Sequence, residues 1–135
     1  MFNCLIVPLD GSELAERALP YAVQLAKVGG GRVVLYHEAP VPISSDIIDV
    51  RRYRADTRAQ AEHYLSSVAH RISPIVRVDI VATFGQAPAE GILNTAKQHT
   101  ADAVVMATHG RSGLPHLLYG SVAEAVWPQV TCPSF

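Results

Sequence analysis

The sequence predicts an α/β domain with a mostly parallel sheet and helices on both faces of that sheet. Short apolar runs typical of strands alternate along the chain with segments of helical periodicity. The first and last of these runs are apolar throughout, which suits strands buried on both faces. Four strand–helix repeats indicate βαβ units with right-handed crossovers, and 49% of the 135 residues are hydrophobic. We therefore expect one domain over residues 1–135, large enough to bury a core.

The first repeat begins with Cys4–Leu9, a continuous apolar run that predicts a buried strand. Ser12 is a good N-cap for the helix that follows, and Pro20 predicts a bend within that helix because proline lacks a backbone donor. Glycines at residues 29–31 end the helix. Because they precede a strand, we interpret them as a C-cap and not as a dinucleotide fingerprint.

The middle of the chain supplies two further repeats. Arg32–His37 predicts the second strand, and Ala61–Ile72 has the spacing of an amphipathic helix that starts in the forties or fifties. The third strand, Val76–Ala82, alternates apolar and polar residues, which indicates a position at the sheet edge. Pro88 falls in the first turn of a third helix that ends near His99.

The fourth repeat carries a central strand and the start of a last helix. Ala103–Ala107 is apolar throughout, and residues 121–124 form a capping-box pattern before a helix that Pro128 ends or kinks. Open parallel sheets bind ligands beyond the carboxyl ends of their strands, where the strand order reverses. With the first and fourth strands central, we expect a binding crevice between residues 9–10 and residues 107–109.

Composition and charge exclude several classes of protein. Eleven basic against twelve acidic residues leave a formal net charge of −1, without the clustered basic face of a nucleic-acid-binding protein. No apolar run reaches the roughly 18 residues of a membrane span, and the N-terminus lacks the charged start of a signal peptide. Cys4 and Cys132 lack zinc spacing. We therefore expect a cytoplasmic protein with no disulfide framework, no metal site of its own, and no nucleic-acid or membrane partner.

The segment after the fourth strand combines features of an anion site. Gly110 and Gly113 follow a buried strand, and residues 120–121, a Gly-Ser pair, precede a helix whose first N–H groups are unpaired. Together with Arg111, these groups favour an anion, phosphate above all. Asp10 on the opposite wall could hold a ribose hydroxyl or help to bind a metal ion on phosphates. The alternative is purely structural, with glycines for turns and the serine as a helix cap.

These motifs resemble those of the universal stress protein family over essentially the whole chain. Leu5–Ser12 matches the family's ILVPLDGS-type segment, and Gly110, nine residues, Gly120 and Ser121 match the end of its G-x2-G-x9-G-[ST] signature. The resemblance implies a single flavodoxin-like or Rossmann-like doubly wound parallel sheet with strand order 3-2-1-4-5. It also implies that the chain belongs to the UspA-like, ATP-binding branch of the family, in which the nucleotide lies between the ends of strands one and four.

The resemblance further implies how the nucleotide lies. The adenosine would lie against the end of the first strand and be bordered by residues 37–39, and the phosphates would lie on the glycine loop. The ligand would be ATP, or AMP or ADP, with or without Mg²⁺. The residues that we expect to bind it are Pro8, Asp10, Glu38, Met106, Ala107, His109, Gly110, Arg111, Gly120, Ser121 and Val122.

Two features depart from the family pattern. Ala107 replaces the first glycine of the signature, and its methyl group would crowd the sugar and modestly lower affinity. After residues 131–133 the sequence ends at Phe135, so we expect the fifth strand to be absent or truncated. In the family that strand often pairs across a dimer axis. We expect another chain or a rearranged tail to cover the bare strand edge, in a homodimer or higher homo-oligomer.

Three functions remain open at this point. The first is a stress-responsive regulatory protein that binds ATP, the second is an interaction module without nucleotide, and the third is a slow ATPase. The chain has no P-loop, HExxH or GxSxG motif, and no residue strongly orients an attacking water, so we expect no catalytic residues and at most weak ATP hydrolysis. The retained Gly110, Gly120 and Ser121 favour the first function over the second.

Overall fold

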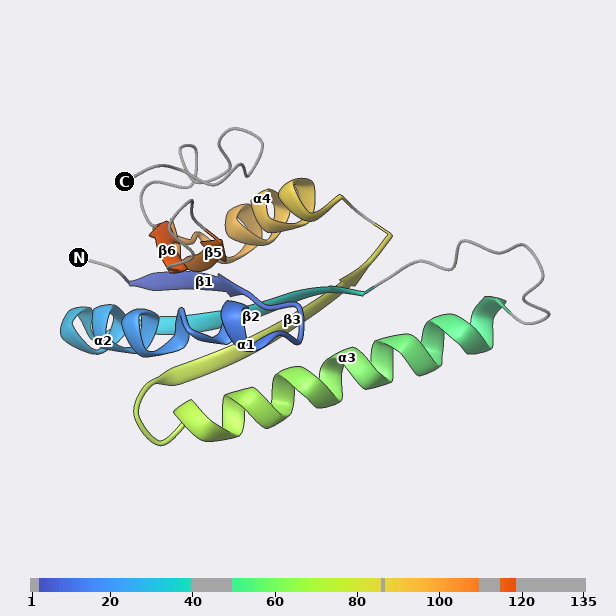
Figure 1. The fold of residues 1–135 in the computed structure, drawn as a ribbon, viewed down its shortest axis with the longest axis horizontal. Coiled ribbons are helices and arrows are strands. Elements are labelled where there is room, and N and C mark those ends of the chain that lie inside the picture. The colour runs from blue at the N-terminus through green and yellow to red at the C-terminus, as the bar shows by residue number, and fades with distance from the viewer. Residues whose placement is uncertain (1–2, 40–49, 86, 110–114, 119–135) are drawn as a thin grey trace.

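Four parallel strands form the main sheet of the computed structural model, which describes residues 3–39, 50–85, 87–109 and 115–118 (Figure 1). The strand order β3-β2-β1-β4 is the one expected for a doubly wound α/β fold. The strands are β1 (Cys4–Pro8), β2 (Arg32–Ala39), β3 (Arg77–Phe84) and β4 (Ala103–Val104). The edge position expected for the third strand is confirmed, since within the described residues β3 pairs with β2 alone.

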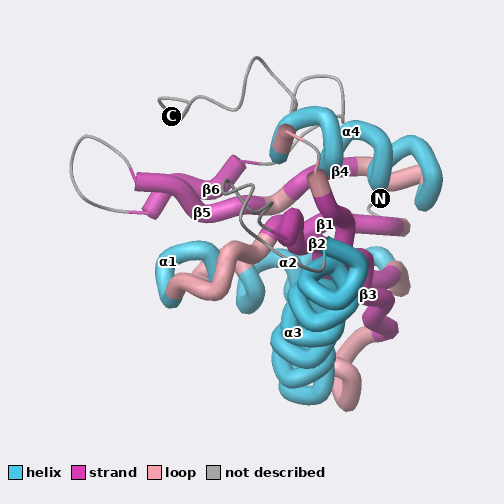
Figure 2. Tube along the Cα trace, turned by 90° about the vertical axis from the view of Figure 1, so that its right-hand side faces the viewer, coloured by secondary structure: helices cyan, strands magenta, loops and turns pink. Residues whose placement is uncertain are grey.

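Helices cover both faces of this sheet (Figures 1 and 2). They are α1 (Glu13–Glu16), α2 (Leu19–Gly29), α3 (Val50–Ile72) and α4 (Pro88–His99). Alternation along β1 divides the core in two. Leu5 and Val7 pack with the buried residues of α2 and α3, whereas Cys4 and Ile6 pack with Ile92 of α4. β1 is thus buried on both faces, as its unbroken apolar run predicts.

Local sequence signals set the helix ends. Ser12 Oγ accepts a hydrogen bond from the N–H of Ala15 at 3.1 Å and caps α1. Gly30 ends α2 with a φ of +67°, a conformation that glycine adopts at little cost. The expected single bent helix is wrong, because the chain forms two helices. Pro20, in the first turn of α2, has no N–H to donate to the carbonyl of Glu16 four residues earlier.

The expected fourth strand beside the first is confirmed, but it is shorter than Ala103–Ala107, because those residues divide between two sheets. β4 pairs with β1, and the N–H of Val105 still donates to the carbonyl of Ile6 at 2.8 Å. The next strand, β5 (Met106–His109), pairs antiparallel with β6 (Pro115–Leu118). β6 lies in the segment between Gly110 and Gly120, for which the sequence predicts no strand. Its four residues show no alternation that would predict a strand, and the pairing with β5 sets their conformation.

Several expectations fall outside the described residues. They concern the last helix from Ser121, the absent or truncated fifth strand and the surroundings of Cys132. Among the described residues, no helix is long and apolar enough to cross a membrane.

Candidate nucleotide-binding site

A pocket of about 270 Å³ lies beyond the carboxyl ends of β1 and β2, with residues that follow β4 on another side. Strand order reverses at β1, which has β2 on one side and β4 on the other, and open parallel sheets bind ligands at such a point. The volume of the pocket is near the lower end of the roughly 300–1,000 Å³ typical of ligand pockets, which suits a group the size of a nucleoside. The lining residues come from β1, β2, β5, α1, α4 and the β1–α1 connection. They are Pro8, Leu9, Asp10, Ala15, Tyr36, His37, Glu38, Ile92, Met106 and Ala107.

Five of the eleven expected binding residues meet in this pocket, namely Pro8, Asp10, Glu38, Met106 and Ala107. His109 is the last residue of β5 and stands in register with Pro115 of β6. The other five expected residues lie outside the described residues: Gly110, Arg111, Gly120, Ser121 and Val122. The described pocket therefore corresponds to the nucleoside part of the expected site.

Three lining residues were not expected from the sequence. The sequence could have predicted Tyr36, because side chains two residues apart in a strand lie on the same face and Tyr36 precedes the expected residue Glu38 by two. No feature of the sequence predicts Ala15 or Ile92 as pocket residues, since they reach the pocket only through the packing of α1 and α4 over the strand ends. Sequence periodicity assigns such residues to the core.

Asp10 is fixed just beyond the end of β1. Its Oδ1 accepts a hydrogen bond from the N–H of Ser12 at 2.9 Å. Hydrogen bonding from Ser12, chiefly from its side chain, lowers the pKa of the Asp10 carboxyl below its ordinary value, although partial burial opposes this effect. Asp10 is therefore an ionised acceptor at neutral pH, held in place before any ligand arrives.

Glu38 is held by two hydroxyl groups. Tyr36 Oη donates to Glu38 Oε1 at 2.5 Å, and Thr83 Oγ1 is hydrogen-bonded to the same oxygen and lies 2.9 Å from Tyr36 Oη. Burial, with help from the Glu38 carboxylate, raises the pKa of Tyr36, so its hydroxyl keeps the proton that it donates. Helix α4 passes directly over these atoms because Gly91 has no side chain. An added Cβ there would lie 1.7 Å from Tyr36 Oη.

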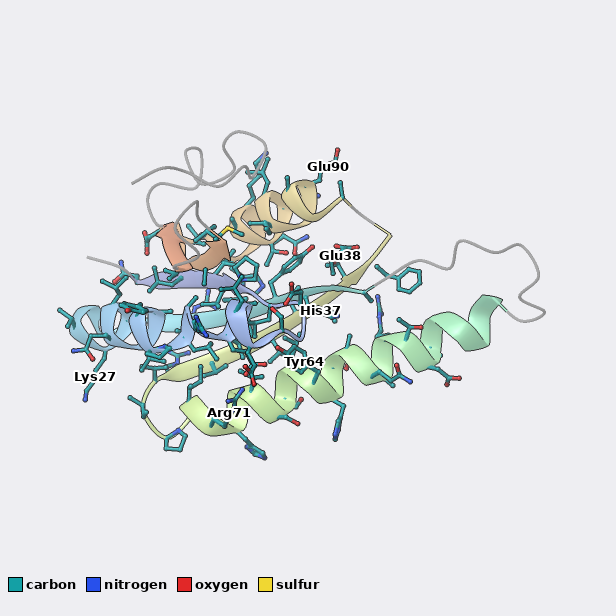
Figure 3. The ribbon with its side chains drawn as sticks, in the orientation of Figure 1. Lys27, His37, Glu38, Tyr64, Arg71 and Glu90 are labelled. Atoms are coloured by element: carbon teal, nitrogen blue, oxygen red, sulfur yellow. The ribbon has the colours of Figure 1, made fainter. Side chains whose placement is uncertain are left out.

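His37 links the end of β1 to α3. Its Nδ1 lies 2.8 Å from the carbonyl oxygen of Leu9, and because a carbonyl only accepts, Nδ1 carries the proton. The His37 ring meets Tyr64 edge to face, with centroids 5.9 Å apart (Figure 3). Tyr64 Oη donates to Glu16 Oε2 at 2.8 Å, and Arg71 pairs with Glu16 Oε1 at 2.6 Å. The network thus ties α1 and α3 to the pocket wall.

The pocket therefore offers two fixed carboxylates and apolar walls. Carboxylates accept hydrogen bonds and repel anions, so the pocket suits a neutral group that carries N–H and O–H donors. Within the described part of the chain, no group of three or more His, Cys, Asp or Glu side chains could hold a metal ion.

A second hollow, of about 830 Å³, lies beside β3, lined by residues of α3, β3 and α4 that include Asp79 and His99. Arg32 already engages both of these side chains. Its Nη1 lies 2.7 Å from Asp79 Oδ2 and 3.3 Å from His99 Nδ1. The pocket at the ends of β1 and β2 is therefore the stronger candidate for a ligand site.

The chain is similar in sequence to universal stress proteins. The sequence model of the Universal stress protein family matches residues 1–134. Universal stress protein YxiE of Bacillus subtilis is 31% identical over 144 residues, which cover 98% of this chain and 97% of that protein.

The fold is similar to solved structures of the same kind. A crystal structure of a universal stress protein family member from Burkholderia pseudomallei has a TM-score of 0.71 at 24% identity, covering 97% of this chain and 92% of that one. An Arabidopsis thaliana family protein with AMP bound has a TM-score of 0.55 at 18% identity, covering 83% and 80% respectively. At these identities the two structures show a shared fold.

Proposed function

We propose, from the premise that this chain belongs to the universal stress protein family, that it is a regulatory protein of the stress response that binds an adenine nucleotide, ATP above all. The observation that carries the proposal is the meeting of five expected residues in one nucleoside-sized pocket at the reversal of strand order. The Arabidopsis protein of the same fold, which holds AMP, supports the choice of an adenine nucleotide.

In this proposal the nucleoside occupies the pocket and the phosphates lie outside it. Asp10 accepts the ribose hydroxyls, residues 37–39 border the base, and residues 106–107 form the ribose side. The carboxylates of Asp10 and Glu38 would repel phosphates within the pocket. We propose, as the family resemblance implies, that the phosphates would be bound by the glycine loop through Gly110 and residues 120–122, with Arg111 and His109 as further contacts. Mg²⁺, when present, would be held on the phosphates.

We also propose that the nucleotide acts as a signal more than as a substrate. Among the described residues β4 pairs with β1 only, and a second copy of the chain in a cytoplasmic homo-oligomer would cover the other edge of β4. Nucleotide binding would then set the oligomeric or partner state. Size-exclusion chromatography with and without ATP measures this effect, and an elution volume independent of ATP would contradict it.

A thermal-shift titration with ATP and Mg²⁺ tests the binding proposal. A ligand that binds the native state raises the melting temperature, and at one hundred times Kd it adds about 2.7 kcal/mol of stability. Asp10→Ala should reduce the shift and Gly120→Val should abolish it, whereas Glu13→Ala, at an exposed position on α1, is the matched control. An unchanged melting curve at millimolar ATP would favour the interaction module. Phosphate release well above that of Gly120→Val would favour the ATPase.

A further inference from the structure

We propose that the outer edge of β3 binds a second copy of this chain, which adds its own β3 in the antiparallel direction so that one sheet continues through both copies. This inference goes beyond the proposed function and does not depend on nucleotide binding. β3 and β4 are the two edges of the main sheet, so a dimer through β3 leaves the edge of β4 free for the assembly proposed above.

The outer edge of β3 is long enough to hold another strand. Its eight residues, Arg77–Phe84, pair with β2, and within the described residues no strand lies on their other side. An open strand edge presents backbone N–H and C=O groups that can pair with a strand of another chain. A typical strand has only about five or six residues, so β3 offers a full strand length for such pairing.

The two faces of β3 differ in character near its start. Val78 and Ile80 pack against the core beneath α2 and α3. Arg77 and Asp79 are exposed and, since side chains alternate along a strand, lie together on the other face. A strand added to this edge would therefore meet one positive and one negative side chain on the same face.

Arg77 has no ion-pair partner among the described residues. The parallel register places it directly opposite Arg32 of β2, where like charges repel. Arg32 instead turns to Asp79, with Nη1 2.7 Å from Oδ2, and its Nη2 donates to the carbonyl of His99 at 3.1 Å. Asp79 Oδ1 accepts no hydrogen bond from any described residue. The edge thus carries an unpaired cation and an available carboxylate oxygen.

These charges select one antiparallel register. A two-fold axis at Val78 places Arg77 of each copy opposite Asp79 of the other copy, which forms two ion pairs across the axis. An axis at residue 77 would bring two arginines face to face, and an axis at residue 79 would do the same with two aspartates. The edge is therefore complementary in charge to itself, which identifies a second copy of the chain as its occupant.

The hollow beside β3 suits the same dimer. Small side chains of α3 line it, namely Ser66, Ala69 and Ser73. In a two-fold dimer the same surface of the second copy faces the hollow, and small side chains let the two α3 helices approach each other closely. Ile75, in the turn before β3, has 53% of its surface exposed, and the register carries it toward Val81 of the second copy. Because exposed ion pairs contribute little by themselves, this apolar contact supplies most of the association free energy.

Sedimentation velocity of the full chain without nucleotide, over a range of concentrations, tests this surface. We expect the wild type to form a dimer. Arg77→Glu sets two carboxylates opposite each other at both contacts, and we expect it to raise the dissociation constant of the dimer roughly tenfold or more. Lys27→Glu is the matched control and should leave the dimer unchanged, because it makes the same charge change at an exposed position of α2 that points away from the sheet (Figure 3).

Mixing two charge variants provides a second readout. Asp79→Lys alone sets cations opposite each other at both contacts and should also dissociate the dimer. A mixture of Asp79→Lys and Arg77→Glu restores opposite charges at both contacts, so we expect it to form heterodimers. A mixture that stays monomeric while both variants are folded by circular dichroism would overturn the inference. If Asp79→Lys does not fold, because Arg32 loses its partner, the comparison of Arg77→Glu with Lys27→Glu decides.

Two further results would contradict the proposed dimer. One is a wild-type chain that stays monomeric up to millimolar concentration. The other is an Arg77→Glu dimer as tight as that of Lys27→Glu, which would assign the association to another surface. Because Arg77 starts β3 and the nucleotide pocket lies beyond the carboxyl ends of the strands, Arg77→Glu should keep the rise in melting temperature with ATP. Loss of the dimer is thereby distinguished from loss of nucleotide binding.

Discussion

His37 Nδ1 donates a hydrogen bond to the carbonyl oxygen of Leu9 at 2.8 Å, which fastens the end of β1 to β2 one residue before Asp10. Leu9 is buried, with 3% of its surface exposed, so its carbonyl depends on this imidazole in addition to any backbone partner. The bond therefore sets the direction in which the chain leaves β1, and with it the position of the Asp10 carboxylate.

Replacing His37 tests this relationship. His37→Phe keeps an aromatic ring against Tyr64 but leaves the Leu9 carbonyl without the imidazole donor. We expect the free energy of unfolding, measured with urea, to fall by about 1–2 kcal/mol. His63→Phe, at an exposed position on α3, is the control. A His37→Phe chain as stable as the wild type would show that the bond contributes nothing to the fold.

Gly91→Ala tests the close approach of α4 to β2. Alanine in place of glycine ordinarily stabilises a helix by about 0.5–1 kcal/mol. Here the new Cβ would lie 1.7 Å from Tyr36 Oη and 2.8 Å from Tyr36 Cζ. We therefore expect a loss of about 1–3 kcal/mol, in the opposite direction. Tyr36→Phe in the same chain removes the nearer atom and should partly restore the melting temperature; a stabilised Gly91→Ala chain would contradict the packing described.

The acid dependence of stability tests the ion pair between Glu16 and Arg71. Hydrogen bonding from Arg71, and less strongly from Tyr64, holds the pKa of Glu16 below its ordinary value of 4.5. A carboxyl whose pKa is lowered on folding contributes stability above its unfolded pKa, and this contribution is lost as the pH falls toward the folded pKa. The half-exposed Arg71 limits the contribution to about 0.5–1 kcal/mol.

Glu16→Gln should therefore be less stable than the wild type at neutral pH, with the difference shrinking as the pH falls below 4.5. Urea unfolding of both chains over this range is the measurement, and Glu13→Gln, at an exposed position on the same helix, is the control. A difference that stays constant or grows toward acid would show that the ion pair is not the cause.

Ala107→Gly tests whether the methyl group of Ala107 limits binding. Ala107 is 8% exposed and lines the pocket, so its methyl group occupies space beside the expected ribose. We expect the glycine variant to bind ATP a few-fold more tightly and to lose roughly 0.5–1 kcal/mol of stability, since glycine costs more backbone entropy in a strand. Calorimetric titration would contradict this prediction if the variant bound ATP more weakly than the wild type.

The sequence alone predicts most of the parallel sheet, because each of its first three strands carries a local signal. Buried strands have unbroken apolar runs, as in Cys4–Leu9, and the edge strand alternates. Pro88 and His99 also mark the observed bounds of α4. The division at Val105 could not be predicted in this way, because Ala103–Ala107 is uniformly apolar and its change of partner from β1 to β6 depends on tertiary pairing.

The candidate site, too, could be predicted only in part from the sequence. Asp10 lies just beyond β1, Glu38 lies near the end of β2, and Met106 and Ala107 lie just beyond β4. Because the ends of parallel strands meet at one edge, their meeting could be predicted. The hydroxyl pair that holds Glu38 could not, since it joins Tyr36 to Thr83 on a different strand through a register that only the folded sheet reveals.

The most direct test of the binding site is a two-dimensional ¹H–¹⁵N NMR spectrum of the 135-residue chain, recorded while ATP with Mg²⁺ is added. If the nucleoside occupies the proposed pocket, the amide signals of Asp10, Glu38, Met106 and Ala107 should shift and saturate together. An unchanged spectrum at millimolar ATP, or shifts confined to Ser66, His70 and Asp79 around the hollow beside β3, would contradict the proposed site.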